Sequence, residues 1–373
     1  MKNVPSSSHC LDRREFVARF GAGLAALSLA PRVWAASAAP EKKLGVALVG
    51  LGGYSTGQLG PALKETKYCR LAGVVTGSRS KGERWAREYG FSGKNIFSYD
   101  TMDQIAGNPD IDIVYVVTPN SMHAENTIAA AKAGKHVISE KPMANTVAEC
   151  DAMIAACRDA KVKLSIGYRL HFDPYHQELM RHAREKDFGL LSKITGDFSF
   201  YMQGRPWRAI RKYSGGGPIM DIGIYVIHAA CMAANGVAPV AVTAKEGPKT
   251  RPAIFQDVEE SISFTMEFPA GEKCEASTSY SNNSNRFRAE GDKGWIDFSN
   301  TFSYRGLRAT TSRGALHFDP PVNQQALQMD DFARCIMEDR ESSVAGELGR
   351  RDLAIIEAIY EAARTGKRTL VKA

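Results

Sequence analysis

The sequence predicts an α/β fold in which a doubly wound parallel sheet is followed by an α+β domain with a large, mostly antiparallel sheet. Between residues 44 and 139, short apolar runs alternate with segments compatible with helices, which is typical of parallel strands buried on both faces. From about Lys193 the apolar residues recur with a period of two, which indicates strands with one solvated face. We therefore expect a first domain over residues 42–165 and a second over 166–373.

The expected elements follow one another in a regular order. The apolar run Leu44 to Val49 leads through a glycine-rich turn into a helix over 58–67, and the first domain continues with strands over 69–76, 111–118 and 136–139 and helices over 81–89 and 121–133. The strands expected in the second domain are 193–201, 240–245, 261–268, 274–280, 286–290 and 295–298. Two late helices, over 323–339 and 348–364, have a Met and Leu stripe typical of a packed face, and we expect them to lie against the first domain.

Composition and charge exclude several classes of protein. The chain has 373 residues, 44% of them hydrophobic and 24% charged, and a formal net charge of +7. Five cations against two acidic residues within positions 1–35 account for much of that charge, and the later cations are interspersed with acidic residues. We therefore expect no nucleic-acid partner. The seven cysteines are scattered without a C-x-x-C pair, so we also expect no metal site.

Residues 1–38 have the features of a twin-arginine export signal. Arg13-Arg14 precedes an apolar stretch of small residues from Phe20 to Ala30, and small residues suited to cleavage follow up to Ala38. The apolar stretch is about half the roughly 20 residues that span a bilayer, so we expect no stable membrane insertion. The signal predicts a periplasmic protein, exported by a route associated with proteins that take up their cofactor before crossing.

The turn after the first strand reads Gly50-Leu51-Gly52-Gly53-Tyr54-Ser55. Between a strand and a helix, the first glycine permits a tight turn, and the second lets a pyrophosphate approach the amides at the helix N-terminus. Ser55 stands where the complete fingerprint has a third glycine, so a purely structural turn is the alternative. We predict a first domain of the Rossmann type in which a dinucleotide contacts Gly50, Leu51, Gly52, Gly53 and Tyr54.

The end of the second expected strand indicates which dinucleotide binds. Enzymes that use NAD usually have an acidic residue here for the ribose 2′-hydroxyl, whereas this chain has Gly77-Ser78-Arg79-Ser80-Lys81. Hydroxyl and cationic groups suit a 2′-phosphate, so Ser78, Arg79 and Lys81 predict NADP. The alternative is that Arg79 and Lys81 merely begin the following exposed helix.

Polar clusters follow the next two strands. The first comprises Thr118-Pro119-Asn120 with His123, and the second is Glu140-Lys141-Pro142. Ligands of open parallel sheets bind beyond the carboxyl ends of the strands, so we expect Thr118, Pro119, Asn120, His123, Glu140 and Lys141 to face the cofactor.

Together with Met220-Asp221-Ile222-Gly223-Ile224-Tyr225, these motifs occur in an ordered set that resembles the Gfo/Idh/MocA oxidoreductases, in particular their glucose-fructose oxidoreductase branch, from about Leu44 to the C-terminus. The resemblance implies that Lys141 contacts the nicotinamide ribose and the substrate, that Asp221 binds substrate, and that Tyr225 carries the proton where many relatives use a histidine. It further implies that five residues lie near the cofactor or sugar, namely Tyr168, Arg169, Trp207, Arg208 and Tyr304.

The chemistry of the three expected catalytic residues is consistent with this resemblance. Removal of a hydride from a sugar carbon requires loss of the hydroxyl proton, and a phenol with an ordinary pKa of about 10 is a poor base near neutrality. An ammonium group within about 6 Å would favour the phenolate and stabilise a developing alkoxide. Taken singly, Tyr225 could instead be a packed aromatic residue, Lys141 a surface cation and Asp221 a helix N-cap.

We therefore expect an exported oxidoreductase with tightly bound NADP that oxidises an aldose to its lactone and reduces a second sugar, an aldose or a ketose, to a polyol. Three alternatives stay open: an NADP-dependent sugar dehydrogenase with exchangeable cofactor, an enzyme that cleaves glycosides through transient hydride transfer, and a nucleotide- and sugar-binding protein without turnover. The resemblance also implies a homo-oligomer, dimer or tetramer, although the proline-rich arm of the exported relative is largely absent before Leu44.

Overall fold

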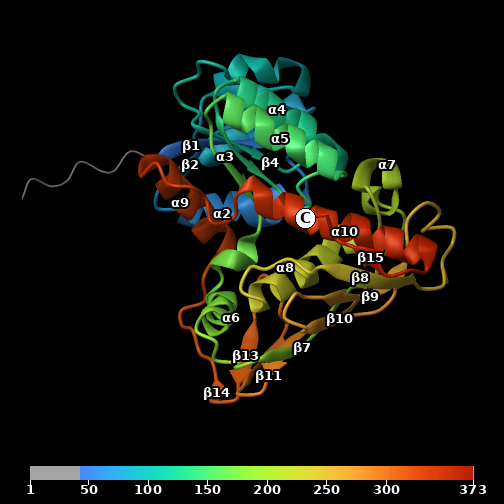
Figure 1. The fold of residues 1–373 in the computed structure, drawn as a ribbon. Helices are drawn as coiled ribbons and strands as arrows, with labels where there is room; N and C mark the ends of the chain where they lie inside the picture. The colour runs from blue at the N-terminus through green and yellow to red at the C-terminus, as the bar shows by residue number, and fades with distance from the viewer. Residues whose placement is uncertain (1–42, 373) are drawn as a thin grey trace, which may run out of the picture. The chain divides into compact units, whose positions relative to one another are not determined.

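The computed structural model describes residues 43–372, and the expected export signal lies outside them. Within this range the chain forms a six-stranded sheet of order β3-β2-β1-β4-β5-β6 and a nine-stranded sheet of order β14-β13-β12-β11-β7-β10-β9-β8-β15 (Figure 1). The first sheet is parallel throughout and the second is mostly antiparallel. The predicted fold class is confirmed.

The parallel sheet has the strand order of a doubly wound fold. Its strands are β1 (Leu44–Val49), β2 (Cys69–Val75), β3 (Ile96–Phe97), β4 (Ile113–Val116), β5 (His136–Ser139) and β6 (Leu164–Ile166). Its helices are α2 (Gly60–Glu65), α3 (Arg79–Tyr89), α4 (His123–Lys132) and α5 (Val147–Asp159), and a π-helical turn η1 (Ser55–Leu59) leads into α2. Because the order reverses between β1 and β4, the loops after these two strands diverge and leave a crevice at the carboxyl edge.

The sequence did not predict α5 or β6, and it placed the start of the helix after the glycine turn too late. α5 has a weak apolar stripe, since only Cys150, Met153 and Cys157 along it are buried, and β6 is a run of three residues. Short or weakly periodic elements of this kind carry little signal in a single sequence.

The second sheet is built from strands with alternating burial. They are β7 (Leu191–Ser199), β8 (Ala241–Glu246), β9 (Ser261–Glu267), β10 (Lys273–Ser279), β11 (Ser284–Gly291), β12 (Trp295–Ser299), β13 (Arg308–Thr311), β14 (Gly314–Ala315) and β15 (Thr369–Leu370). In β9, for example, Ile262, Phe264 and Met266 are buried and Ser263 is exposed, as the period of two predicts. The central pair β7 and β10 is parallel, which the sequence pattern did not distinguish.

The helices of the second half cover one face of this sheet and reach back to the first. α8 (Ile224–Ala233) packs on β7, and α10 (Gly346–Thr365) packs on β8 and α5 (Figure 1). α9 (Gln324–Met337) contacts α2 and β2. α6 (Pro174–Arg184) lies against α8, and the short α7 (Arg211–Ser214) contacts the turn after β4.

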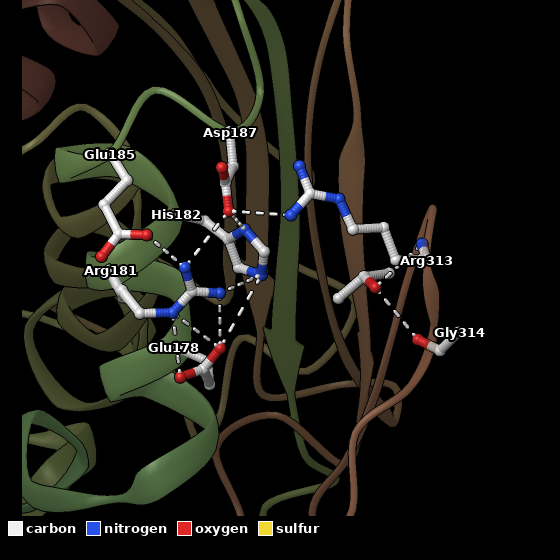
Figure 2. A network of polar contacts seen from close by, with 8 residues as sticks. Glu178, Arg181, His182, Glu185, Asp187, Arg313 and Gly314 are labelled. Atoms are coloured by element: carbon white, nitrogen blue, oxygen red, sulfur yellow. Dashed lines mark hydrogen bonds and ion pairs between the residues drawn. The ribbon is translucent and has the colours of Figure 1, made fainter. Parts of the chain in front are cut away.

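A polar network fastens α6 to the hairpin of β13 and β14 (Figure 2). Asp187 is its centre, because its Oδ2 lies 2.7 Å from His182 Nδ1, 3.2 Å from Arg181 Nη1 and 3.5 Å from Arg313 Nη1. Arg181 also pairs with Glu178 at 2.9 Å. The network lies far along the second sheet and has no residue in the cavity described below.

One helical stretch among residues 43–372, from Arg211 to Ala233, is long and apolar enough to cross a membrane. Its most apolar window is 94% buried inside the protein. This is the burial of a core helix, consistent with the place of α8 between the second sheet and α6.

Candidate functional site

A cavity of about 1270 Å³ lies between the carboxyl edge of the parallel sheet and the end of β7 in the second sheet. The volume exceeds the 300–1,000 Å³ range of ordinary small-molecule pockets, so it offers room for a dinucleotide together with a small substrate. Of the predicted site residues, all but Arg79 and Tyr168 line it: Gly50, Leu51, Gly52, Gly53, Tyr54, Ser78, Lys81, Thr118, Pro119, Asn120, His123, Glu140, Lys141, Arg169, Trp207, Arg208, Asp221, Tyr225 and Tyr304.

The glycine turn has a geometry suited to close approach of a ligand to the backbone. Gly50 has a φ of +99°, a conformation that residues with a side chain rarely adopt. A side chain on Gly52 would meet no protein atom within 4 Å, so that position borders open space in the cavity. Ser55 is fully buried and its hydroxyl donates to the carbonyl of Gly50 at 2.6 Å, which shows how the turn closes without the third glycine.

We call the part of the cavity lined by Gly77, Ser78, Lys81 and Tyr99 its outer end. Two of the three residues expected to hold a 2′-phosphate line it. Ser78 caps α3, and Lys81 Nζ donates to the Leu51 carbonyl at 3.1 Å beside the glycine turn. The side chain of Arg79 lies outside the cavity, donating to Glu83 at 3.2 Å and to the Ile96 carbonyl at 3.3 Å. Glu83 is four residues further along the same helix, so a helical neighbour holds the Arg79 side chain away from the cavity.

The cluster after β4 is held by polar contacts with its neighbours. The ring nitrogens of His123 lie 2.8 Å from the Pro142 carbonyl and 2.9 Å from the Thr118 carbonyl, and burial lowers the pKa of the imidazole. Asn120 Nδ2 donates to the Ser214 carbonyl at 2.9 Å. Both nitrogens of His123 therefore face backbone, and this residue joins the turns after β4 and β5.

Glu140, the first residue of the turn after β5, is buried beneath the cavity. Tyr115 donates its hydroxyl to this carboxyl at 2.8 Å, and Gln328 Nε2 of α9 donates to Tyr115 at the same distance. Burial raises the pKa of Glu140 above its ordinary value, although Lys141 opposes the rise. Glu140, the residue before Lys141, is thus held by a chain of hydrogen bonds that joins β4 and α9.

Lys141, Asp221 and Tyr225 meet at the inner end of the cavity. Lys141 Nζ lies 4.5 Å from the centre of the Tyr225 ring, donates to the Asp221 backbone carbonyl at 2.8 Å and lies 3.9 Å from Asp221 Oδ1. Asp221 and Tyr225 are four residues apart on the π-helical turn η7 (Ile219–Gly223) and the start of α8, so both project from one side of this helical segment.

Asp221 is held as a carboxylate by its neighbours. Arg208 Nε donates to Oδ1 at 3.2 Å, and the Tyr280 hydroxyl donates to Oδ2 at 3.0 Å. Burial by itself would raise the pKa of Asp221, but the charges of Arg208 and Lys141 hold it below its ordinary value. The inner end therefore combines a phenol and an ionised carboxylate, each of which lies against the ammonium group of Lys141.

Tyr54 and Tyr304 approach each other from the two domains. Their ring centres lie 6.2 Å apart, and Tyr304 also stacks on the Arg169 guanidinium at 4.3 Å. Burial, assisted by Glu140, raises the pKa of Tyr54 well above that of a free phenol. Both phenols are therefore neutral hydrogen-bonding groups at ordinary pH.

Tyr168, which we expected near the cofactor or sugar, lies behind the site. Its ring stacks on His228 with 3.9 Å between the ring centres, and it does not line the cavity. Tyr168 is the second residue after β6 and packs against α8, whereas the side chain of the next residue, Arg169, reaches the cavity.

Among the residues that sequence reasoning missed, Tyr99, Tyr280 and Gln324 bear directly on the site. Tyr99 lines the outer end of the cavity and follows β3. A strand of two residues is too short to recognise in the sequence, so the expectation that ligands bind beyond the carboxyl ends of strands could not be applied to it. Tyr280 follows β10 and contacts Asp221, which no spacing reveals. Gln324 of α9 bonds Arg169 from 155 residues away in sequence. In the described part of the chain, no group of three His, Cys, Asp or Glu side chains could hold a metal ion.

Comparisons with known proteins agree with this geometry. Residues 44–168 match the model of an oxidoreductase family with an NAD-binding Rossmann fold, and residues 176–297 match the Gfo/Idh/MocA C-terminal domain. The D-xylose 1-dehydrogenase [NADP(+)] of Haloarcula marismortui is 27% identical over 90% of this chain and 95% of its own length, and the 1,5-anhydro-D-fructose reductase of Ensifer adhaerens is 28% identical over 80% and 90%.

Among solved structures, the aldose-aldose oxidoreductase of Caulobacter crescentus complexed with glycerol is 42% identical, with a TM-score of 0.86 over 88% of this chain and all of the other. A levoglucosan dehydrogenase in complex with NADH and levoglucosan has a TM-score of 0.78 over 89% of this chain and all of its own, and at 22% identity it supports the fold alone. The chain therefore belongs to the Gfo/Idh/MocA family and is an oxidoreductase with a dinucleotide-binding first domain.

Proposed function

We propose that this protein is an exported oxidoreductase that keeps NADP bound, oxidises an aldose to its lactone and reduces a second sugar, an aldose or a ketose, to a polyol. The observation that carries the proposal is the meeting of Lys141, Asp221 and Tyr225 at the inner end of a cavity that has room for a dinucleotide and a sugar. The 42% identity to an aldose-aldose oxidoreductase supports the sugar class and the pairing of two sugars.

The cavity fits the cofactor. Gly52 leaves open space where a pyrophosphate would approach the amides, and Ser78 and Lys81 offer a hydroxyl and an ammonium group to a 2′-phosphate. When bound, NADP supplies an acceptor and donor of hydride. One relative is named for NADP(+) and a structural neighbour was solved with NADH, so the preference for NADP rests on Ser78 and Lys81.

The chain's own residues would handle the sugar and its proton. Tyr225 as phenolate takes the hydroxyl proton of the sugar, and Lys141 stabilises the negative charge that develops on the same oxygen. Asp221, ionised between Arg208 and Lys141, accepts hydrogen bonds from neighbouring sugar hydroxyls. A proton taken from the first sugar stays on Tyr225 and is returned to the second sugar, so the cycle needs no proton from solvent.

The export signal and the assembly belong to the same proposal. A periplasmic enzyme lacks an evident pool of NADP to exchange with, which favours a retained cofactor regenerated by the second sugar. We also propose a homo-oligomer, dimer or tetramer, that uses the face of the nine-stranded sheet opposite α8. The strand registers put Ser263 and Arg286 in one row on that face, and both residues are exposed.

The proposal is tested by absorbance and fluorescence spectra of the purified, dialysed protein with no nucleotide added. A reduced-nicotinamide band that appears with glucose and vanishes when a second aldose or fructose is added would support retention and the two-sugar cycle. Protein free of nucleotide after dialysis, yet active with added NADP, would overturn retention. Protein that binds NADP and sugar without any band would overturn catalysis.

An NADP-dependent sugar dehydrogenase with exchangeable cofactor is the second candidate. The observation that favours it is the exposure of the outer end, where Gly77 is exposed and Ser78 and Lys81 are only half-buried. The rate of NADP dissociation separates the two candidates, since a retained cofactor must leave far more slowly than one turnover takes.

A further inference from the structure

Arg169 is a buried cation whose hydrogen-bond partners include no carboxylate. Its side chain is 1% exposed. Nη2 donates to the Phe302 carbonyl at 2.6 Å, and Nη1 donates to the Ser303 carbonyl at 3.2 Å and to Gln324 Oε1. Within residues 43–372 no Asp or Glu oxygen pairs with it, and its Nε has no hydrogen-bond partner. Neutral dipoles only partly offset the cost of burying a full charge, so the environment calls for an anion nearby.

The groups that face the guanidinium are two phenol rings. Its central carbon lies 4.3 Å from the centre of the Tyr304 ring and 5.0 Å from that of the Tyr225 ring. Burial by itself would lower the pKa of Arg169, but Tyr225, Tyr304 and Tyr54 hold that pKa above its ordinary value. Because Lys141 lies 4.5 Å from the Tyr225 ring centre, Tyr225 has two cations against its ring.

Arg169 is held in place by Gln324, which lies 155 positions later in the chain. Gln324 at the start of α9 is 1% exposed, and its Nε2 donates to Asp173 Oδ2 at 3.0 Å while its Oε1 accepts from Arg169. Asp173 in turn caps α6, accepting from the Tyr175 amide at 3.0 Å. The guanidinium therefore cannot swing toward a ligand without breaking contacts with two loop carbonyls and a glutamine.

We propose that Arg169 is a positioning residue for proton transfer, a fixed cation that stabilises the phenolate of Tyr225 and does not serve primarily to bind the cofactor. The inference rests on the proposed function, which gives Tyr225 the role of proton carrier. The step it assists is a proton transfer: the O–H bond of the sugar breaks, the O–H bond of Tyr225 forms, and Arg169 keeps all its protons. The phenolate is the anion that the buried guanidinium lacks.

The other charged groups around Tyr225 do not replace this role. Asp221 is engaged by Arg208 and Lys141, and burial raises the pKa of Glu140. Burial raises the pKa values of Tyr54 and Tyr304, so neither phenol supplies a charge near neutral pH, and burial lowers the pKa of His228 behind the ring. Lys141 and Arg169 contact the Tyr225 ring, and the titratable groups that line the same two cavities include Asp221, Arg208, Glu140, His123, Tyr54, Tyr304, Tyr168, His176 and His228.

The test compares Arg169→Met, which removes the charge, with Arg169→Lys, which keeps it, and with Arg308→Met on the exposed side of β13 as a matched control. The rate of aldose oxidation in a single turnover is measured against pH with saturating NADP. Since an opposite charge in contact shifts a titration by about 1–3 pH units, we expect the rising limb of Arg169→Met to move at least one unit to higher pH. Arg169→Lys should recover most of the shift, and Arg308→Met should match the wild type.

A second readout does not depend on turnover. The phenolate absorbance of each nucleotide-free variant is measured against pH, and the signal that disappears in Tyr225→Phe is assigned to Tyr225. It should appear at higher pH in Arg169→Met than in the wild type. If Arg169→Met does not fold, Gln324→Met loosens the guanidinium and should give a smaller shift in the same direction.

The outcomes distinguish this inference from the proposed function. An unchanged pH profile and unchanged absorbance titration in Arg169→Met, with a weaker affinity for NADP, would assign Arg169 to the cofactor and overturn the inference while the sugar oxidation of the wild type stands. A wild-type protein that oxidises no aldose with NADP would overturn the proposed function, and the absorbance titration would still decide whether Arg169 stabilises the Tyr225 phenolate.

Discussion

The two ends of the cavity are built in different ways. At the inner end Lys141 and Asp221 have side chains that are 11% and 16% exposed, and each is held by groups from distant parts of the chain. At the outer end Tyr99 is 37% exposed, and Lys81 makes one hydrogen bond through its ammonium group, to Leu51. Charges that are buried and held in position stabilise a developing charge far better than charges in water, so reactivity should depend on the inner end and choice of cofactor on the outer end.

The largest effect should come from Tyr225→Phe. Loss of the proton carrier should lower the single-turnover rate of aldose oxidation by about 10²–10⁴-fold, the range typical of a general base, without weakening NADP binding. The rate and the nucleotide titration are measured on the same sample, with Tyr213→Phe on the exposed α7 as the control. A variant that keeps the wild-type rate would mean that the inner end is a binding site without catalysis.

Asp221→Asn should have the next largest effect. The substitution leaves Arg208 without its counter-charge and takes a hydrogen-bond acceptor from the sugar. Because bonds to a charged group contribute about 1.5–3 kcal/mol, kcat/KM for the sugar should fall by about 10- to 100-fold. Tyr280→Phe, which removes only the bond to Oδ2, should fall less, and an equal or greater loss in Tyr280→Phe would show that this tyrosine acts on the substrate directly.

This contrast between the ends also marks what could be predicted from the sequence. Motifs at the ends of strands located Gly50, Glu140 and Lys141, because the carboxyl edge of a parallel sheet brings such positions together whatever the details of packing. Tyr225 and Asp221 were found by their resemblance to a family pattern, and four-residue spacing put them on one side of a helix.

The residues that could not be predicted are those whose partners are remote in the chain. Tyr280 bonds Asp221 across 59 positions, and Gln324 bonds Arg169 across 155, and neither pair shares a local pattern. The side chain of Arg79 lies outside the cavity for the opposite reason: its motif has the expected composition, but a neighbour on the same helix, Glu83, pairs with the side chain. Composition near a strand end therefore identifies the region where a cofactor binds. The direction of each side chain there also depends on neighbouring residues that compete to pair with it.

The inner end should also contribute to stability in a pH-dependent manner. Although burial opposes it, Arg208 and Lys141 lower the pKa of Asp221 in the folded state. The unfolded chain therefore binds this proton more readily, so the contribution is complete above the unfolded value of about 3.9 and is lost as the pH falls below it. On acidification below about pH 4, the Tm of the wild type should accordingly fall more than the Tm of Asp221→Asn. A difference that stays constant from pH 7 to pH 3 would contradict the assignment of a lowered pKa.

The smallest effect should come from substitutions at the outer end, and it tests most directly how the two ends of the cavity differ. Lys81→Met should reduce the preference for NADP over NAD by roughly 5-fold, about 1 kcal/mol, because a partly exposed charge pair is weakened by water and salt. Arg79→Met removes the same charge two residues away, but that side chain lies against Glu83 outside the cavity, so the preference should change less than 2-fold. The ratio of the two dissociation constants, measured by nucleotide fluorescence at low and at physiological salt, checks both variants. Equal losses in Lys81→Met and Arg79→Met would mean that Arg79 leaves Glu83 when NADP binds, and the outer end would then be assembled by the ligand, in contrast to an inner end that is in place beforehand.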